Sequence, residues 1–355
     1  MTRADKLREK IAPFADAIVL TEPLSQYYIC GFRYTDGYVL VTTKSAHLIT
    51  DFRYVEAAQK LAPAGFEIVT PARGDGMAKY MREVLEREGA KTVAFEEDRI
   101  TYAEHEKLAN ALGVTLVPSR GAVETMRRIK DRGEVDKMRA AQKITDDAFT
   151  HILGVITPEM TEIEVATELE YFMRKHGAED KSFDTICVSG SASSLPHGVP
   201  RNVKLERGFL TMDFGCIIDG YHSDMTRTVC LGKADDEMKR LYATVLKAQL
   251  AAMEGAKVGM KCAAIDAIAR DIIEDAGYHG AFGHSLGHSV GLEIHEAPNF
   301  APRSSDFFEN GHVMTVEPGI YLAGKYGCRI EDMIYAEDGK VISLTASDKQ
   351  LIELF

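Results

Sequence analysis

The stretch Phe209–Cys230, FLTMDFGCIIDGYHSDMTRTVC, decides the fold of the second half of this chain. Apolar residues crowd both arms of the stretch, and the tetrapeptide IDGY at residues 218–221 is a turn signal, so the sequence predicts a β-hairpin. Each arm carries one carboxylate, Asp213 or Asp224, and a buried carboxylate needs a positive partner. The hairpin alone leaves two interpretations open: a cation bound between the acids, or an exposed strand edge that carries them.

Three segments further along the chain place ionisable residues among apolar ones. Residues 283–298, GHSLGHSVGLEIHEAP, contain three histidines, while Glu317 lies in TVEPGIY and Glu331 in RIED. Taken singly, each segment has an ordinary explanation, because a core histidine is more often a packing residue than a ligand and a strand glutamate is usually solvated.

The acids on several strands and the histidine among them indicate, when taken together, that these residues share a cation. Oxygen-rich ligation with one imidazole suits Mn²⁺, Fe²⁺, Co²⁺ or Zn²⁺. Four carboxylates neutralise two divalent ions, so the pattern predicts a dinuclear site.

The remainder of the second half alternates long amphipathic helices with strands. This pattern predicts an α+β domain in which helices pack on an antiparallel sheet. We expect helices at residues 124–154, 162–176, 235–255 and 262–276, and strands at residues 184–190, 284–295, 313–320 and 329–336.

The first part of the chain alternates short strands and helices, which is typical of a compact α/β domain. The charged helical pattern begins near residues 119–123, so we predict one domain of residues 1–122 and a second of residues 123–355. We expect strands at residues 17–21, 38–43, 45–51, 92–95 and 115–118, and helices at residues 4–12, 53–60, 76–88 and 102–112.

The composition is that of an ordinary globular protein, with 45% hydrophobic and 27% charged residues among 355. A net charge of −12 disfavours nucleic acid or an anionic membrane as the main partner. No apolar run approaches membrane-spanning length, and the charged start of the chain lacks the apolar core of a signal peptide. Six scattered cysteines without a CxxC pair predict reduced thiols, so we expect a cytoplasmic protein.

The chain resembles the pita-bread metallopeptidases over essentially its whole length, and in particular the branch of aminopeptidase P and prolidase. The resemblance implies a pita-bread catalytic domain preceded by a smaller creatinase-like α/β domain, which matches the segments GF, DG and TDFRY near residues 31–54 and MRRIK at residues 126–130. In that family two metal ions are held by five residues, which match Asp213 in MDFG, Asp224 in SDMTRT, His288 in GHSVG, Glu317 in VEPGIY and Glu331 in RIED.

The resemblance also implies a mechanism in which two divalent cations, Mn²⁺ before Co²⁺, Zn²⁺ or Fe²⁺, share a bridging hydroxide that attacks the scissile carbonyl. Glu317 is then both a ligand and the general base. His197 and His295 match histidines that stabilise the oxyanion, and His284 matches one that lines the pocket beyond the scissile bond.

Two further residues are predicted at the substrate end of the site. Arg329 precedes the ligand Glu331 and is expected to orient the carboxylates. Tyr221, beside the hairpin turn, is expected to help shape the pocket for the amino-terminal residue of the substrate.

The substrates implied by the resemblance are small peptides with proline in the second position, cleaved by an enzyme that is usually a homodimer. An Xaa-Pro bond has no N–H, and a site built around metals and histidines does not need one. Many relatives carry an arginine after the HEAP segment, and in some prolidases an arginine near there receives the dipeptide carboxylate. This chain has Asn299 at that position and Arg303 nearby. We therefore predict an aminopeptidase of the aminopeptidase P type, with an Xaa-Pro dipeptidase as the alternative.

Two other classes of protein use related scaffolds. One is a metal-free carbon–nitrogen hydrolase like creatinase, and the other is a non-catalytic binding protein. The presence of all five candidate ligands argues against both.

Overall fold

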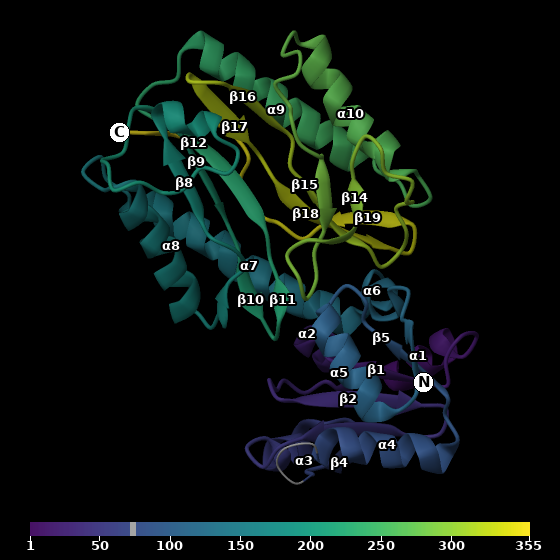
Figure 1. Ribbon diagram of the computed structural model, residues 1–355. Helices are drawn as coiled ribbons and strands as arrows, with labels where there is room; N and C mark the ends of the chain where they lie inside the picture. The colour runs from purple at the N-terminus through teal and green to yellow at the C-terminus, as the bar shows by residue number, and fades with distance from the viewer. Residues whose placement is uncertain (72–75) are drawn as a thin grey trace. The chain divides into compact units, whose positions relative to one another are not determined.

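The computed structural model describes residues 1–71 and 76–355, which form two compact units, Met1–Arg127 and Arg128–Phe355 (Figure 1). The division between the units falls a few residues beyond the one that we predicted between residues 122 and 123. All six cysteines are buried free thiols. Within the described ranges, no helix is both long enough and apolar enough to cross a bilayer.

The first unit is built on a six-stranded sheet in the order β4-β3-β2-β1-β5-β6. Side chains of two helices pack with apolar sheet residues to form its core: Met81, Val84 and Leu85 from one helix, and Leu108 and Leu112 from the other. The strands are β1 (Ala17–Leu20), β2 (Gly37–Thr42), β3 (Ala46–Thr50), β4 (Glu67–Val69), β5 (Thr92–Phe95) and β6 (Thr115–Pro118). The helices are α1 (Arg3–Ile11), α2 (Pro23–Cys30), α3 (Val55–Leu61), α4 (Gly76–Glu88), α5 (Tyr102–Leu112) and α6 (Ala122–Arg127). The predicted α/β alternation is therefore confirmed.

The second unit places two pairs of helices against two principal sheets (Figure 1). α7 (Arg132–Val155) and α8 (Glu162–Lys175) pack on the sheet ordered β20-β12-β9-β8, while α9 (Asp236–Gly255) and α10 (Cys262–Asp275) pack largely on the sheet ordered β14-β13-β15-β18-β19. Apolar side chains of the helices meet apolar side chains of the strands in both layers, which confirms the α+β prediction.

The strands of the second unit also include two small sheets, β11-β10-β7 and β16-β17. The first members are β7 (Asp180–Lys181), β8 (Ile186–Ser189), β9 (Gly208–Phe214), β10 (Cys216–Ile218), β11 (Tyr221–His222) and β12 (Met225–Leu231). The later ones are β13 (Gly287–Ser289), β14 (Glu296–Phe300), β15 (Val313–Val316), β16 (Gly319–Leu322), β17 (Tyr326–Arg329), β18 (Asp332–Glu337), β19 (Lys340–Ser343) and β20 (Glu353–Leu354), and a 3₁₀-helix spans Gly190–Ser194.

The predicted hairpin is confirmed. β9 pairs antiparallel with β12 along its whole length, and β10 and β11 continue the ribbon to its tip. At the tip, Asp219 and Gly220 have φ values of 47° and 81°, the left-handed pair that favours Asp-Gly in tight hairpins. The register pairs Asp213 with Thr226, so Asp224 lies just before the paired segment of its strand.

Two strands that we predicted as continuous, residues 313–320 and 329–336, are each divided in two. β15 and β16 belong to different sheets, and so do β17 and β18. The first break contains Pro318, whose ring nitrogen cannot donate to a strand ladder. Each break leaves one glutamate, Glu317 or Glu331, where the chain passes from one sheet to another.

Two further predictions of continuous elements are wrong. The predicted strand at residues 284–295 is regular only at β13, because the register shifts after His288 and a loop follows. The predicted helix at residues 124–154 is two helices, α6 and α7. Asp131 caps the second one by accepting from the Glu134 amide, while the Glu134 carboxylate accepts from the Asp131 amide.

Candidate metal centre

The two carboxylates of the hairpin lie on the inner side of the second unit. Asp213, near the end of β9, and Asp224, just before β12, are both buried. The Asp224 amide donates to the sulfur of Met333 at 3.2 Å, which ties this aspartate to the neighbouring β18. The hairpin therefore presents its acids to the other sheet rather than to an exposed edge.

His288 faces the hairpin from β13. Its Nε2 lies 3.6 Å from Oδ2 of Asp224 and 3.4 Å from Oε1 of Glu317. Its Nδ1 lies 3.2 Å from the carbonyl oxygen of Ser289, which can only accept, so the ring hydrogen belongs on Nδ1. The lone pair of Nε2 thus points at the carboxylates, as a metal ligand requires.

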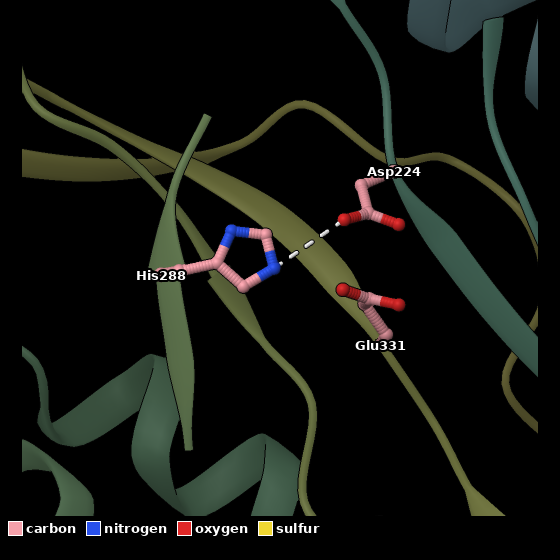
Figure 2. A group of neighbouring side chains, drawn as sticks. All are labelled: Asp224, His288 and Glu331. Carbon is pink, nitrogen blue, oxygen red and sulfur yellow. Dashed lines mark ion pairs between the residues drawn. The ribbon is translucent and has the colours of Figure 1, made fainter. Parts of the chain in front are cut away.

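Glu331 completes a group whose ligand atoms lie within 4.8 Å of one another, together with Asp224 and His288. Figure 2 shows the three side chains converging from three different strands or strand ends. Glu331 Oε2 accepts from the Thr226 hydroxyl at 2.7 Å, and Glu317 Oε1 accepts from the Thr315 hydroxyl at 3.2 Å.

The crowding of acids disfavours their ionised forms. Burial, and then the nearby Asp213, raise the pKa of Asp224 well above its usual value, while burial and Asp224 do the same for the pKa of Glu331. Burial raises the pKa of Glu317 to about 8. The pKa of His288 falls to about 3, mainly through burial, so its imidazole is neutral.

The donor set fits divalent cations. Oδ1 of Asp213 is buried without a hydrogen-bond partner among the described residues. Burial of a carboxylate oxygen costs free energy unless a cation or a hydrogen-bond donor approaches it. Four carboxylates and one neutral imidazole are the ligands that suit Mn²⁺, Fe²⁺, Co²⁺ or Zn²⁺.

Arg329 links the carboxylate cluster to Tyr321 and to the segment before His197. Its Nη2 donates to Oδ2 of Asp213 at 2.5 Å, and its Nη1 donates to the hydroxyl of Tyr321 at 2.7 Å and to the carbonyl of Pro196 at 3.1 Å. Its Nε donates to the Thr226 hydroxyl at 3.0 Å. One guanidinium thus holds both the candidate ligand Asp213 and the segment before His197. This geometry suits the orienting role that we predicted for Arg329.

Tyr321 was not among the predicted site residues. Its hydroxyl lies 3.0 Å from Nε2 of His284, whose Nδ1 lies 2.8 Å from the carbonyl of Ser285. That carbonyl assigns the ring hydrogen to Nδ1, so Tyr321 donates to Nε2 and accepts from Arg329. The only sequence signal was an aromatic residue with a polar tip in a segment that also carries Glu317.

A cavity of about 830 Å³ opens over the cluster. The five candidate ligands, Arg329 and all three other predicted histidines line it, as does Asn299. The ring of His295 meets that of His288 edge to face, with centroids 4.4 Å apart. Burial, then the nearby His197, lower the pKa of His295.

Tyr221 lies elsewhere. Its side chain is buried, its hydroxyl donates to Oε1 of Glu134 at 2.5 Å, and it is not among the residues that line the cavity. A role for Tyr221 in binding substrate has no support from this geometry and stays a prediction. Arg303 is exposed and likewise does not line the cavity.

Comparison with known protein families agrees with this arrangement. The model of metallopeptidase family M24 matches residues 136–338, and that of the creatinase/prolidase N-terminal domain matches residues 3–129. The chain belongs to metallopeptidase family M24. It is therefore a metal-dependent peptidase with a creatinase-like N-terminal domain and a pita-bread catalytic domain, in a family that uses a dinuclear centre of divalent metal ions.

Several members of the M24 family are similar to this chain along almost its whole length. The solved Xaa-Pro dipeptidase from Bacillus anthracis is 43% identical with a TM-score of 0.96, and the match covers 99% of each chain. The solved X-Pro aminopeptidase from Thermotoga maritima is 35% identical with a TM-score of 0.93, over 99% of this chain and 100% of that one. The Xaa-Pro dipeptidase of Pyrococcus horikoshii is 36% identical over 95% of this chain and 94% of its own.

Proposed function

We propose that this chain is an Xaa-Pro dipeptidase that hydrolyses the bond before proline in dipeptides, with two divalent cations, Mn²⁺ foremost, held by the cluster. The observation that carries the proposal is the convergence of four carboxylates and His288 at the floor of the cavity. The choice of a dipeptidase rests on similarity to proteins that bear that name. It replaces our first prediction of an aminopeptidase, which favoured longer peptides.

The chain's own residues divide the chemical work. The bound cations would supply Lewis acidity at the scissile carbonyl and lower the pKa of a water molecule. Glu317 takes the proton from that water as general base and passes it to the leaving proline nitrogen. His295 and His197 donate hydrogen bonds to the oxygen that becomes negative. Arg329 holds Asp213 and the carbonyl of Pro196, which fixes the segment that carries His197.

The chemistry of the Xaa-Pro amide bond fits these roles of the site residues. The amide before proline is tertiary and has no N–H, so the site needs no acceptor for one. Proton delivery to the proline nitrogen matters more, because a secondary amine anion is a poor leaving group. His284 faces the same cavity and is kept in one tautomer by Tyr321 and Ser285, so it can contact the prolyl side of the substrate.

The second candidate is aminopeptidase activity on longer peptides, and a specific observation favours it. A dipeptidase must receive the free carboxylate of the proline, which an arginine fork does best. At the cavity wall this chain has the neutral Asn299, and Arg303 does not line the cavity. The solved aminopeptidase from Thermotoga maritima is also a close structural match.

The deciding experiment compares kcat/KM for Ala-Pro and Ala-Pro-Ala with Mn²⁺ present. The proposal expects Ala-Pro to be the better substrate, and a clear preference for Ala-Pro-Ala would make the chain an aminopeptidase instead. Arg303→Ala serves as a matched variant. If Arg303 swings in to hold the carboxylate, the variant loses activity on Ala-Pro while activity on Ala-Pro-Ala stays near wild type.

A cytoplasmic homodimer is the assembly and location that we propose for the enzyme. The six free buried thiols are consistent with a reducing compartment. Light scattering on the purified protein tests the oligomer, and a mass close to the 39.2 kDa of one chain would contradict it.

A further inference from the structure

We propose that Lys130 is a positioning residue for the two adjoining histidines of the cavity, His288 and His295. Its Nζ donates to the hydroxyl of Ser289 at 2.9 Å and to Oε2 of Glu296 at 3.0 Å. The side chains of Lys130 and Glu296 are 1% and 7% exposed, so the pair is shielded from water. The inference rests on the proposed function, because its effect is read on the same reaction.

The two partners of Lys130 are the two ends of one loop. Ser289 ends β13 and Glu296 begins β14, and they face each other across the strand pair just where its register shifts. The Lys130 ammonium therefore links the two ends of the loop, Ser289 and Glu296, where the register shift disrupts the backbone hydrogen bonds of the strand pair.

The same carboxylate also organises the interior of the loop. Oε1 of Glu296 accepts from the Glu293 amide at 3.2 Å, and the Gly291 amide donates to the Glu293 carbonyl at 3.0 Å. A Cβ on Gly291 would come within 2.5 Å of that carboxylate, so the backbone is wrapped closely around it. Lys130 neutralises the negative charge of the Glu296 carboxylate, around which the loop folds.

Each end of the loop is the direct chain neighbour of a cavity histidine. His288 precedes Ser289, and its ring is oriented by the Ser289 carbonyl. His295 precedes Glu296, and its ring stands at 72° to that of His288. Displacement of either loop end would change the angle between the rings, and the proposed ligand would no longer be aligned with the proposed oxyanion donor.

Lys130 can hold the loop in position because its own backbone is fixed by a hydrogen bond and by the adjoining helix cap. It lies in the break between α6 and α7, where its amide donates to the carbonyl of Gly311 at 2.9 Å. The next residue, Asp131, is the N-cap of α7. The lysine thus reaches Ser289 from a segment 159 residues away in sequence, with its own backbone held in place.

A buried ion pair is weak evidence for stability, since well-packed apolar residues of similar volume often stabilise a protein equally well or better. This allows the positioning role to be separated from a structural role. Lys130→Met removes the cation from Glu296, whereas the double variant Lys130→Met/Glu296→Gln removes both charges and keeps an oxygen that accepts from the Glu293 amide. Lys143→Met, at an exposed lysine paired with Asp147, is the matched control.

The experiment measures kcat and KM on Ala-Pro at saturating Mn²⁺, unfolding by urea, and the visible spectrum of the Co²⁺-loaded proteins. We expect Lys130→Met to lower kcat by roughly 10- to 100-fold, as is typical when support of a metal ligand is lost, with KM changed less. We expect the double variant to recover stability but not kcat, and both variants to shift the Co²⁺ bands.

Recovery of kcat together with stability in the double variant would overturn the proposal, and so would unchanged Co²⁺ bands in both variants. If Lys130→Met does not fold, the double variant alone decides. Absence of Xaa-Pro hydrolysis in the wild type would refute the proposed function instead, and the Co²⁺ spectra would still test the positioning of His288.

Discussion

Removal of the metal ions should make the stability of this protein depend on pH in a characteristic direction. In the metal-free protein the pKa of Glu317 is about 8, raised chiefly by burial. Between pH 6.5 and 8 the folded protein therefore keeps a proton on Glu317, while the unfolded chain has lost it. Because the folded state binds more protons at this group, the contribution of Glu317 to stability falls as the pH rises through this window.

The size of the effect follows from one proton. A full proton difference changes the free energy of unfolding by about 1.4 kcal/mol for each pH unit, and the slope halves at the pKa. Glu317 alone thus accounts for a loss of roughly 1–2 kcal/mol between pH 6.5 and 8. Asp224 and Glu331, whose pKa values are also raised, steepen the loss.

The buried histidines act in the opposite direction. Burial lowers the pKa of His312 and of His222 to about 4, so both rings resist protonation and destabilise the folded state below their ordinary pKa near 6.5. These effects have the opposite sign and are only half complete at pH 6.5, where an ordinary histidine of the unfolded chain is still half protonated. Wild type and Glu317→Gln share them, so the difference between the two proteins isolates the contribution of Glu317. Bound cations stabilise the ionised carboxylates, so the contribution of Glu317 should be absent from the metal-loaded enzyme over the same range.

The assay is urea unfolding of chelator-treated and Mn²⁺-loaded protein at pH 6.5, 7.25 and 8, on wild type, Glu317→Gln and the exposed control Glu159→Gln. Between pH 6.5 and 8 we expect metal-free wild type and the control to become less stable, relative to metal-free Glu317→Gln, by about 1–2 kcal/mol. The same pH dependence in metal-free wild type and metal-free Glu317→Gln would refute the reasoning.

Three further outcomes are expected. Dialysis against a chelator should abolish peptidase activity and addition of Mn²⁺ or Co²⁺ should restore it, whereas full activity in metal-stripped protein would rule out the mechanism. His288→Ala should lower the bound metal measured by elemental analysis, while His295→Ala should keep the metal and lose about 10²-fold in kcat; the reverse pattern would exchange their roles. Tyr321→Phe should lower the free energy of unfolding by about 1–3 kcal/mol, because Arg329 and His284 both lose a buried partner; unchanged stability would show that water replaces the hydroxyl.

The sequence was informative where local chemistry and long-range structure agree. The hairpin could be predicted because its turn residues, Asp219 and Gly220, tolerate the left-handed backbone that the tip requires. The α/β and α+β character of the two units followed from patterns that repeat over many residues. Acids among apolar residues indicated a shared cation, because such acids are rare without a positive partner. The five candidate ligands themselves, with His288 chosen among three histidines, came from the resemblance to the metallopeptidase family.

Contacts between distant segments could not be predicted in the same way. Nothing in the sequence near Lys130 indicates that its ammonium reaches Glu296, and the uninterrupted helical spacing around it led us to predict one long helix. The link from Arg329 through Tyr321 to His284 is equally invisible, because it depends on how three strands and loops approach one another. Substrate length is harder still, since it depends on single side chains such as Asn299.

Breaks between strands position three of the five candidate ligands, whereas Asp213 and His288 lie within β9 and β13. Within a regular strand, successive side chains alternate between the two faces of one sheet, so only every second residue can face the site. Glu317 and Glu331 each lie where the chain leaves one sheet for another, and Asp224 lies just before its strand begins. The directions of these three side chains are therefore not limited to the two faces of one sheet.

Such an arrangement requires the two sheets to be tied together at the site itself, and Thr226 makes this connection. Its carbonyl accepts from the Glu331 amide at 3.1 Å, and its hydroxyl donates to the Glu331 carboxylate at 2.7 Å. Its neighbour Arg227, fully buried, donates to the Glu331 carbonyl at 2.6 Å and to Asp332 at 2.8 Å. Polar residues that look out of place in a buried strand thus hold the ligands of one sheet against those of the other. The SDMTRT and RIED segments are therefore two halves of one structural connection as well as sources of ligands.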